Sequence, residues 1–162
     1  MYYACFKALV IETASHIADK QGLNSLSLKA VAEELNVRTP SLYNHIESLD
    51  DLLREVAHKG MRSMNEQMAQ AAIGKSGNTA LKGVSVEYLN FIIEHPGVYE
   101  TIQWATWHGT DETAQIFGNY IKILSTIISS YNFSSESAGD ILNLLTGFLH
   151  ALPLCKCVMP FP

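Results

Sequence analysis

Apolar residues recur at intervals of three and four along the 162-residue chain, and this spacing constrains the fold more than any other feature of the sequence. The interval matches one face of an α-helix, whose turn takes about 3.6 residues. We find no internal repeat, no low-complexity stretch and no alternating run long enough to suggest a sheet. The sequence therefore predicts an all-α protein.

Capping and turn-forming residues divide the chain into helices. Ser27 is a suitable N-cap for the second helix, which should stop at Asn36, and Thr39 and Ser48 are suitable caps for the third and fourth. The segment "GKSGN" at 74–78 predicts a linker. The expected helices cover about 6–20, 28–35, 39–46, a longer stretch from 49, and then 79–94, 98–107, 111–131 and 135–152.

Composition places the chain among globular proteins, with 48% apolar and 17% charged residues. No apolar run reaches the roughly 18 residues that a membrane-spanning helix requires. The first residues, "MYYACFK", have no basic leader and no long apolar stretch after them, so we expect no secretion signal. The expected location is the cytoplasm, without a membrane partner.

Three cysteines, Cys5, Cys155 and Cys157, form an odd and sparse set that is typical of a reduced compartment. Cys155 and Cys157 can bind a metal ion, but two thiolates alone do not complete a tetrahedral site. The alternative is an irregular tail, because the two prolines of "VMPFP" prevent a regular helix. We expect no metal and no cofactor.

The net charge of -5 argues against a surface that attracts nucleic acid indiscriminately. Residues 1–62 hold seven Lys or Arg against eight acids, and residues 63–162 hold four against eight. The amino-terminal part is thus the less acidic of the two, but it is not basic.

The segment "LNVRTPSLYNHI", residues 35–46, predicts a very short helix beside a longer one. Three apolar side chains can anchor the short helix: Val37, Leu42 and Ile46. On a helix anchored by Leu42 and Ile46, which are four residues apart, Ser41, Tyr43 and Asn44 point away from the core. Two helices joined by a turn of about three residues, with a polar outward surface on the second, form a helix-turn-helix.

This region resembles the DNA-binding segment of the TetR family of transcriptional regulators. The matching stretch is "LSLKAVAEELNVRTPSLYNHIESLDDLL", residues 26–53. In that family a threonine or serine opens the second helix, "VA" and a "LGV" turn follow, and a small residue, "LY" and "H" mark the recognition helix. Residues 10–56 match the spacing without a gap. The resemblance implies a DNA-binding domain at 1–50 and a helical ligand-binding and dimerisation domain at 51–162.

The resemblance also implies roles for individual residues, because recognition helices of this kind enter the major groove. The candidates for base or groove contacts are Arg38, Thr39, Ser41 and Asn44. The candidates for phosphate contacts are Ser27, Tyr43 and His45. Tyr43 can instead pack its ring against the first helix, and His45 can lie at the edge of the small core.

The chain departs from the family pattern at the start of the fourth helix. Leu49, followed by Asp50 and Asp51, stands where the family usually has a lysine, and no arginines precede the first helix. Fewer phosphate contacts predict lower affinity and a shallower salt dependence, since each contact contributes about -0.9 to the log-log slope.

Aromatic residues are frequent after residue 79, in the region where the TetR family holds a small-molecule pocket. The candidates for ligand binding are Tyr88, Phe91, Trp104, Trp107, His108, Phe117 and Tyr120. Aromatics at helical spacing are more often ordinary core, and that alternative stays open for each of them. His108, next to Gly109, can equally cap a helix end. The segment "EHPGVY", 94–99, resembles a common feature of the family's carboxy-terminal domains.

The last two expected helices carry broad apolar faces that a small monomer would struggle to cover. A homodimer through these helices is the natural solution, and it places two recognition helices about one DNA turn apart, roughly 34 to 36 Å. The segment "LLTGFLHALPL", 144–154, resembles the family's final interface helix, although Pro153 stops it earlier than in most members.

These features predict a repressor that binds a double-stranded DNA operator as a homodimer and is released by a small apolar effector. A helical enzyme that uses His108, His95 or His150 as a general base is a rival, but no recognisable spacing supplies a nucleophile or carboxylate partner. We therefore expect no enzymatic activity. A second rival is an interaction protein with impaired DNA binding that dimerises with a related subunit.

Overall fold

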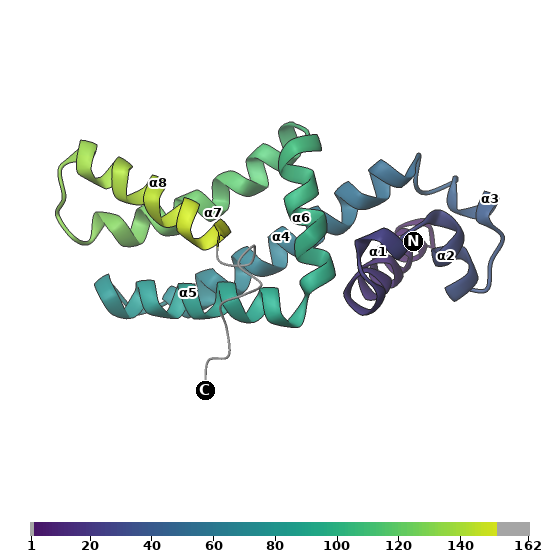
Figure 1. Ribbon diagram of the computed structural model, residues 1–162, viewed down its shortest axis with the longest axis horizontal. Coiled ribbons are helices and arrows are strands. Elements are labelled where there is room, and N and C mark those ends of the chain that lie inside the picture. Colours follow the sequence, from purple (N-terminus) through teal and green to yellow (C-terminus); the bar gives the residue numbers. More distant parts are fainter. Residues whose placement is uncertain (1, 152–162) are drawn as a thin grey trace. The chain divides into compact units, whose positions relative to one another are not determined.

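The computed structural model describes residues 2–151, which form eight α-helices and one short 3₁₀ helix (Figure 1). The α-helices are α1 Tyr2–Gln21, α2 Leu28–Glu34, α3 Thr39–Leu42, α4 Leu49–Ala72, α5 Gly77–Glu94, α6 Pro96–His108, α7 Asp111–Ser129 and α8 Ser135–Ala151; the 3₁₀ helix η1 is Leu23–Ser25. The prediction of an all-α fold is confirmed. Pro153, Cys155 and Cys157 lie outside the described residues.

Several helix ends form as the local sequence predicts. The Ser27 hydroxyl accepts a hydrogen bond from the Ala30 backbone N–H at 3.1 Å, which caps α2. Asn36 takes the left-handed conformation after that helix, with φ of 53°. Ser48 caps α4 by accepting from the Asp51 N–H at 3.1 Å. These three predictions are confirmed.

Several boundaries differ from the expected ones. α3 ends at Leu42 and not near Ile46, and α6 begins at Pro96 and not at Val98. α1 begins at Tyr2 and not near Phe6, because no glycine, proline or capping residue interrupts the chain before Phe6. Thr39 is the first residue of α3 and not its cap; Arg38 takes the extended cap position and makes no side-chain capping bond. α5 begins inside the expected linker, at Gly77. Its φ of 52° is a left-handed conformation that glycine adopts readily.

In the part of the chain that the structure describes, no helix combines the length and the apolar character that crossing a membrane requires.

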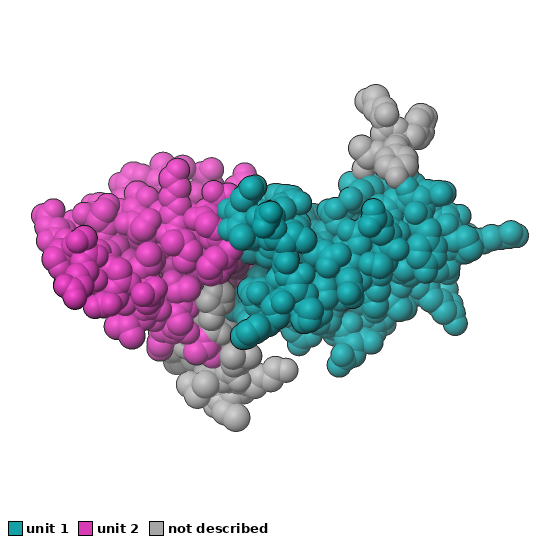
Figure 2. All heavy atoms as spheres, turned by 90° about the horizontal axis from the view of Figure 1, so that it is seen from above, with its two compact units in different colours: residues 1–63, 93–116 teal, residues 64–92, 117–162 magenta. Residues whose placement is uncertain are grey.

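The chain divides into two compact units, coloured separately in Figure 2. Unit 1 contains residues 1–63 and 93–116, and unit 2 contains residues 64–92 and 117–162. Unit 1 therefore combines α1, α2, α3 and the first part of α4 with α6, which lies far away in the sequence. The functional boundary expected at residue 50 stays a prediction, because compactness alone does not define function.

Unit 1 buries one apolar face from each of its main helices. The residues with the least exposure include Val10, Ala14, Val31, Leu42, Ile46, Leu52 and Val56. α1 contacts α2, η1 and α6. The helix that carries the outward polar surface is thus anchored to a well-filled core.

Unit 2 has its own core, in which aromatic residues are prominent. Its most deeply buried side chains include Met68, Val84, Tyr88, Phe91, Tyr120 and Leu124. The rings of Tyr88 in α5 and Tyr120 in α7 lie 6.1 Å apart, within the range of a favourable aromatic pair.

Candidate DNA-binding surface

α2, the turn after it and α3 form a helix-turn-helix in unit 1. The turn is fixed by the Val37 N–H, which donates to the Ala32 carbonyl at 2.9 Å. Two apolar residues hold the short α3 segment in place: Leu42 is 0% exposed and Ile46 is 1% exposed. Because a four-residue helix is not stable alone, its orientation depends on these anchors.

The side chains before and between these anchors form an outward polar surface. Arg38, Ser41, Tyr43 and Asn44 are exposed, and Thr39 is half-buried. Tyr43 is 57% exposed, so its ring lies on the surface and is not part of the core. Four of the sequence-predicted DNA contacts therefore lie close together along one exposed segment.

Besides Thr39, two further candidates occupy more protected positions. His45 is half-buried, and its ring lies 4.9 Å from the ring of Phe6 in α1. This contact supports the alternative that His45 lies at the edge of the core. Ser27 is half-buried and uses its oxygen to cap α2, but the hydroxyl keeps a proton that it can donate to a phosphate.

Most cations around this surface are already paired with acids of the same unit. Lys7 lies 2.5 Å from Glu55, and Lys59 pairs with Glu12. Both ion pairs join α1 to α4. Within residues 2–151, Arg38 makes no such ion pair. Its guanidinium is consequently available to an external acceptor.

A group of contacts made by Asp19, here called the clasp, joins α1 to α6. Asp19, near the end of α1, accepts a hydrogen bond from the Val98 N–H at 2.8 Å and pairs with His95 at 2.9 Å. His95 is the N-cap of α6 and has no capping bond from its own side chain, so Asp19 performs that role from another helix. No local signal in the sequence predicts this contact, because Asp19 and His95 lie 76 positions apart.

A buried histidine connects α4 to the start of α7. His58 is 4% exposed, and its Nε2 lies 2.7 Å from the Thr113 hydroxyl. Desolvation by burial lowers the pKa of His58 from its ordinary value of 6.5, and the nearby Glu112 carboxylate opposes this only in part. Arg62 also pairs with Glu112. Together these contacts hold the α6–α7 junction against α4.

The seven predicted ligand-binding residues do not gather in one compact unit. Tyr88, Phe91, Phe117 and Tyr120 belong to unit 2, and the first two and Tyr120 are buried there. Trp104, Trp107 and His108 belong to unit 1. His108 stacks on Trp104 with ring centroids 4.6 Å apart, whereas Trp107 is 86% exposed. Their role in ligand binding stays a prediction.

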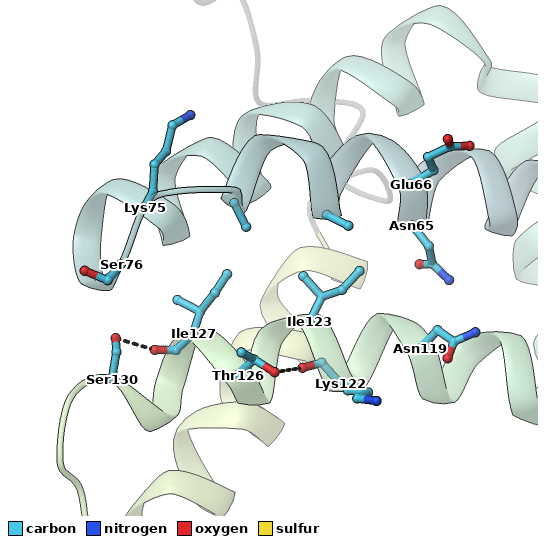
Figure 3. Close-up of a pocket in the computed structure, with 12 residues that line it drawn as sticks. Asn65, Glu66, Lys75, Ser76, Asn119, Lys122, Ile123, Thr126, Ile127 and Ser130 are labelled. Atoms are coloured by element: carbon cyan, nitrogen blue, oxygen red, sulfur yellow. Dashed lines mark hydrogen bonds between the residues drawn. The ribbon is translucent and has the colours of Figure 1, made fainter.

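Unit 2 contains a groove of about 500 Å³ between α4 and α7 (Figure 3). Small residues of α4, Ala69 and Ala72, face Ile123 and Ile127 of α7 across it. None of the seven predicted ligand-binding residues lines this groove. Periodicity gives no signal for such a site, because the groove arises from small side chains on two helices that are far apart in sequence.

No family model matches the chain. It is nevertheless similar to YobS, an HTH-type transcriptional regulator of Bacillus subtilis, with 33% identity over 146 residues that cover 86% of this chain and 75% of YobS. It is also 29% identical over 131 residues to the HTH-type transcriptional regulator Rv0681 of Mycobacterium tuberculosis. That match covers 80% of this chain and 60% of Rv0681, less than two thirds of that relative.

Solved structures show the same fold. A regulatory protein of the TetR family from Rhodococcus RHA1 superposes with a TM-score of 0.76 at 14% identity, covering 96% of this chain and 86% of that one. The TetR family regulator PfmR of Thermus thermophilus gives a TM-score of 0.74 at 15% identity, covering 94% and 88%. BioQ, solved with its double-stranded DNA operator, gives 0.68 at 16% identity, covering 91% and 84%. With its helix-turn-helix and its similarity to YobS, this chain belongs to the HTH-type transcriptional regulators, and its fold is that of the TetR family.

Proposed function

We propose that the chain represses transcription by binding an operator through the outward surface of α3. One observation carries the proposal: Arg38, Ser41, Tyr43 and Asn44 are exposed along a segment that buried anchors hold rigidly. BioQ, which shares the fold, was solved on its double-stranded operator, and this supports DNA as the ligand. An enzymatic role has no comparable support, and the cytoplasm is the compartment where such a repressor would act.

The proposed contacts divide by chemistry. Arg38 donates two parallel hydrogen bonds to a guanine, which contributes roughly 1 to 3 kcal/mol of discrimination. Thr39, Ser41 and Asn44 contact base edges or the groove, while Ser27, Tyr43 and His45 contact phosphates. Exposed Leu49 and the two aspartates after it offer no cation at the start of α4, so the salt dependence should be shallow.

The proposed active form is a homodimer that joins through α7 and α8. Leu144 is 74% exposed and Phe148 is 63% exposed on α8, whereas Leu149 of the same helix is buried. Single chains rarely leave large apolar side chains together on one helix face unless a partner covers them. A two-fold axis would present two α3 segments to the halves of a near-palindromic operator.

A small-molecule effector would release this dimer from DNA. It shifts the equilibrium only by the difference between its affinities for the two states, typically 1 to 3 kcal/mol of coupling.

The test is a nuclease footprint of the purified chain on the DNA that flanks its own coding region, with excess unrelated DNA as competitor. The proposal predicts one or more short protected segments with inverted symmetry. Protection that vanishes with competitor would refute operator recognition. A dimer that forms without any protection would instead favour an interaction protein with impaired DNA binding.

A further inference from the structure

The groove in unit 2 has the dimensions of a small-molecule site. Its volume of about 500 Å³ lies within the usual range for ligand pockets, roughly 300 to 1,000 Å³. Along α7 and the residue after it, the groove runs from Asn119 to Ser130, a span of roughly 16 Å at the rise of an α-helix. The shape therefore suits an elongated molecule better than a compact one.

The middle of the groove is apolar. Ile123 and Ile127 point from α7 toward α4, as Figure 3 shows. Ile127 is 6% exposed and belongs to the core, so this wall is rigid. The opposite wall presents the methyl groups of Ala69 and Ala72 at its middle. The open space exists because two alanines face two isoleucines.

The two ends of the groove differ. At one end, the Gly77 N–H donates to the Ser130 hydroxyl at 3.1 Å, and the Tyr131 hydroxyl donates to the Asn78 side chain at 2.7 Å. These bonds fasten the start of α5 to the end of α7. At the other end, the Asn65 amide, which is 8% exposed, points toward α7, where Asn119 also lines the groove.

The charged residues of the lining avoid the groove itself. Figure 3 shows Lys75 and Glu66 pointing away from α7, and Lys122 pointing away from α4. All three are exposed. An occupant would therefore meet apolar walls, amide groups and the hydroxyl-bearing residues Ser76, Thr126 and Ser130, while the charged ends of the lining residues point away from it.

We infer that this groove binds an elongated, uncharged, largely apolar molecule whose single polar end group lies at Asn65 and Asn119. Each amide can both donate and accept, so an alcohol, an ester or a neutral carboxamide meets its hydrogen-bonding requirements. A carboxylate or an ammonium group is disfavoured, because the charged side chains of the lining point away from the groove and the amides alone compensate poorly for lost hydration. The claim that this ligand is the effector of the repressor rests on the proposed function. The claim that the groove binds it does not.

The test is calorimetric titration of the full chain, without DNA, using octanol, decanol, decanoate and decylamine as probes. Decanol should bind more tightly than octanol, by roughly two- to fourfold for each added methylene. Decanoate and decylamine should bind at least about tenfold more weakly than decanol. Equal binding of decanoate and decanol would overturn the uncharged class, and no saturable decanol binding would overturn the site.

Two variants and one control locate the binding. Ala69→Phe fills the groove and should weaken decanol binding by about tenfold or more, while Ala114→Phe adds the same ring at an exposed position of α7 outside the groove and should leave binding unchanged. Asn65→Leu should weaken decanol binding by roughly fivefold and should also lessen its preference over decanoate. Equal effects of the two phenylalanine variants would refute the location.

Adding decanol to a protein–operator complex separates the site from the proposed function. Binding with release of DNA supports both. Binding that leaves operator affinity unchanged keeps the site and removes its role as effector site. Failure of operator binding in the absence of decanol contradicts the proposed function alone.

Discussion

At the scale of single residues, Gly97 shows how closely two helices approach in unit 1. A Cβ atom at this position would lie 1.9 Å from the Ala18 carbonyl oxygen, which is backbone and cannot rotate away. A side chain here would force α6 away from α1 and would disturb the Asp19 contacts beside it.

Gly97→Ala should therefore lower the free energy of unfolding by at least about 2 kcal/mol. Gly118→Ala is the matched control, because a Cβ there meets no atom within 4 Å in the middle of α7. Removing a flexible residue from a helix should stabilise the protein by roughly 0.5 to 1 kcal/mol. Urea unfolding of both variants measures the contrast; a similar effect of the two substitutions would show that the close approach is not maintained in solution.

His58 gives the stability of the protein a defined pH dependence. Burial lowers its folded-state pKa below 6.5, so the unfolded chain takes up the proton first as the pH falls. The neutral buried imidazole thus contributes stability that is present above about pH 6.5 and is lost as the pH falls below that value toward the lower folded-state pKa.

His58→Gln keeps a hydrogen-bonding group near Thr113 and cannot titrate. Its free energy of unfolding should fall less steeply than that of the wild type as the pH drops below about 6.5. Denaturant unfolding at a series of pH values tests this. Parallel pH profiles for the two proteins would exclude His58 as the cause.

At the scale of elements, α6 depends on α1 for its first turn. Asp19 is mostly buried and provides the cap that the chain next to α6 does not supply. Asp19→Ala should cost about 1 to 2 kcal/mol, within the range of lost helix caps. Asp19→Asn should cost less, since the amide oxygen can still accept from the Val98 N–H.

The control for the Asp19 variants is Asp140→Ala, which removes the same charge from an exposed position on α8 and should change stability by less than about 0.5 kcal/mol. Thermal and urea unfolding provide the measurement. If Asp19→Ala proves as mild as Asp140→Ala, the clasp contributes little to folding.

Local signals predicted the elements better than their mutual contacts. Ser27, Asn36 and Ser48 act on their own or neighbouring backbone, so a sequence window contains everything that determines them. The exposure of Ser41, Tyr43 and Asn44 follows from helical geometry once Leu42 and Ile46 are buried.

Contacts between distant segments could not be predicted in this way. The pairing of Asp19 with His95 and the need for glycine at 97 exist only after α1 and α6 meet. The aromatic residues illustrate the same limit, because Tyr88 is 0% exposed and Trp107 is 86% exposed although both recur at helical spacing. Composition counts such residues but does not distinguish core from surface.

At the scale of the whole molecule, the proposed dimer explains the apolar residues left exposed on α8. Leu144→Glu should weaken self-association by at least about a hundredfold, since a two-fold interface loses the side chain twice. Ile73→Glu is the control, because Ile73 is 67% exposed in the turn after α4, comparable with 74% for Leu144. Sedimentation velocity over a range of concentrations measures both, and a wild-type chain that stays monomeric would refute the dimer.

The central claim is that an anchored α3 segment recognises a DNA sequence through Arg38. The most direct test is fluorescence anisotropy of the full chain on the footprinted duplex and on a scrambled duplex, with Arg38→Ala and Lys82→Ala. Lys82 is an exposed cation on α5 that makes no ion pair within residues 2–151. Lys82→Ala therefore removes one positive charge, as Arg38→Ala does, but away from α3.

We predict that Arg38→Ala weakens binding to the footprinted duplex by about 5- to 150-fold and reduces the preference for it over the scrambled duplex. Lys82→Ala should change neither the affinity nor the preference. Equal affinity of the wild type for both duplexes, or equal affinities of the two variants, would contradict sequence recognition through Arg38.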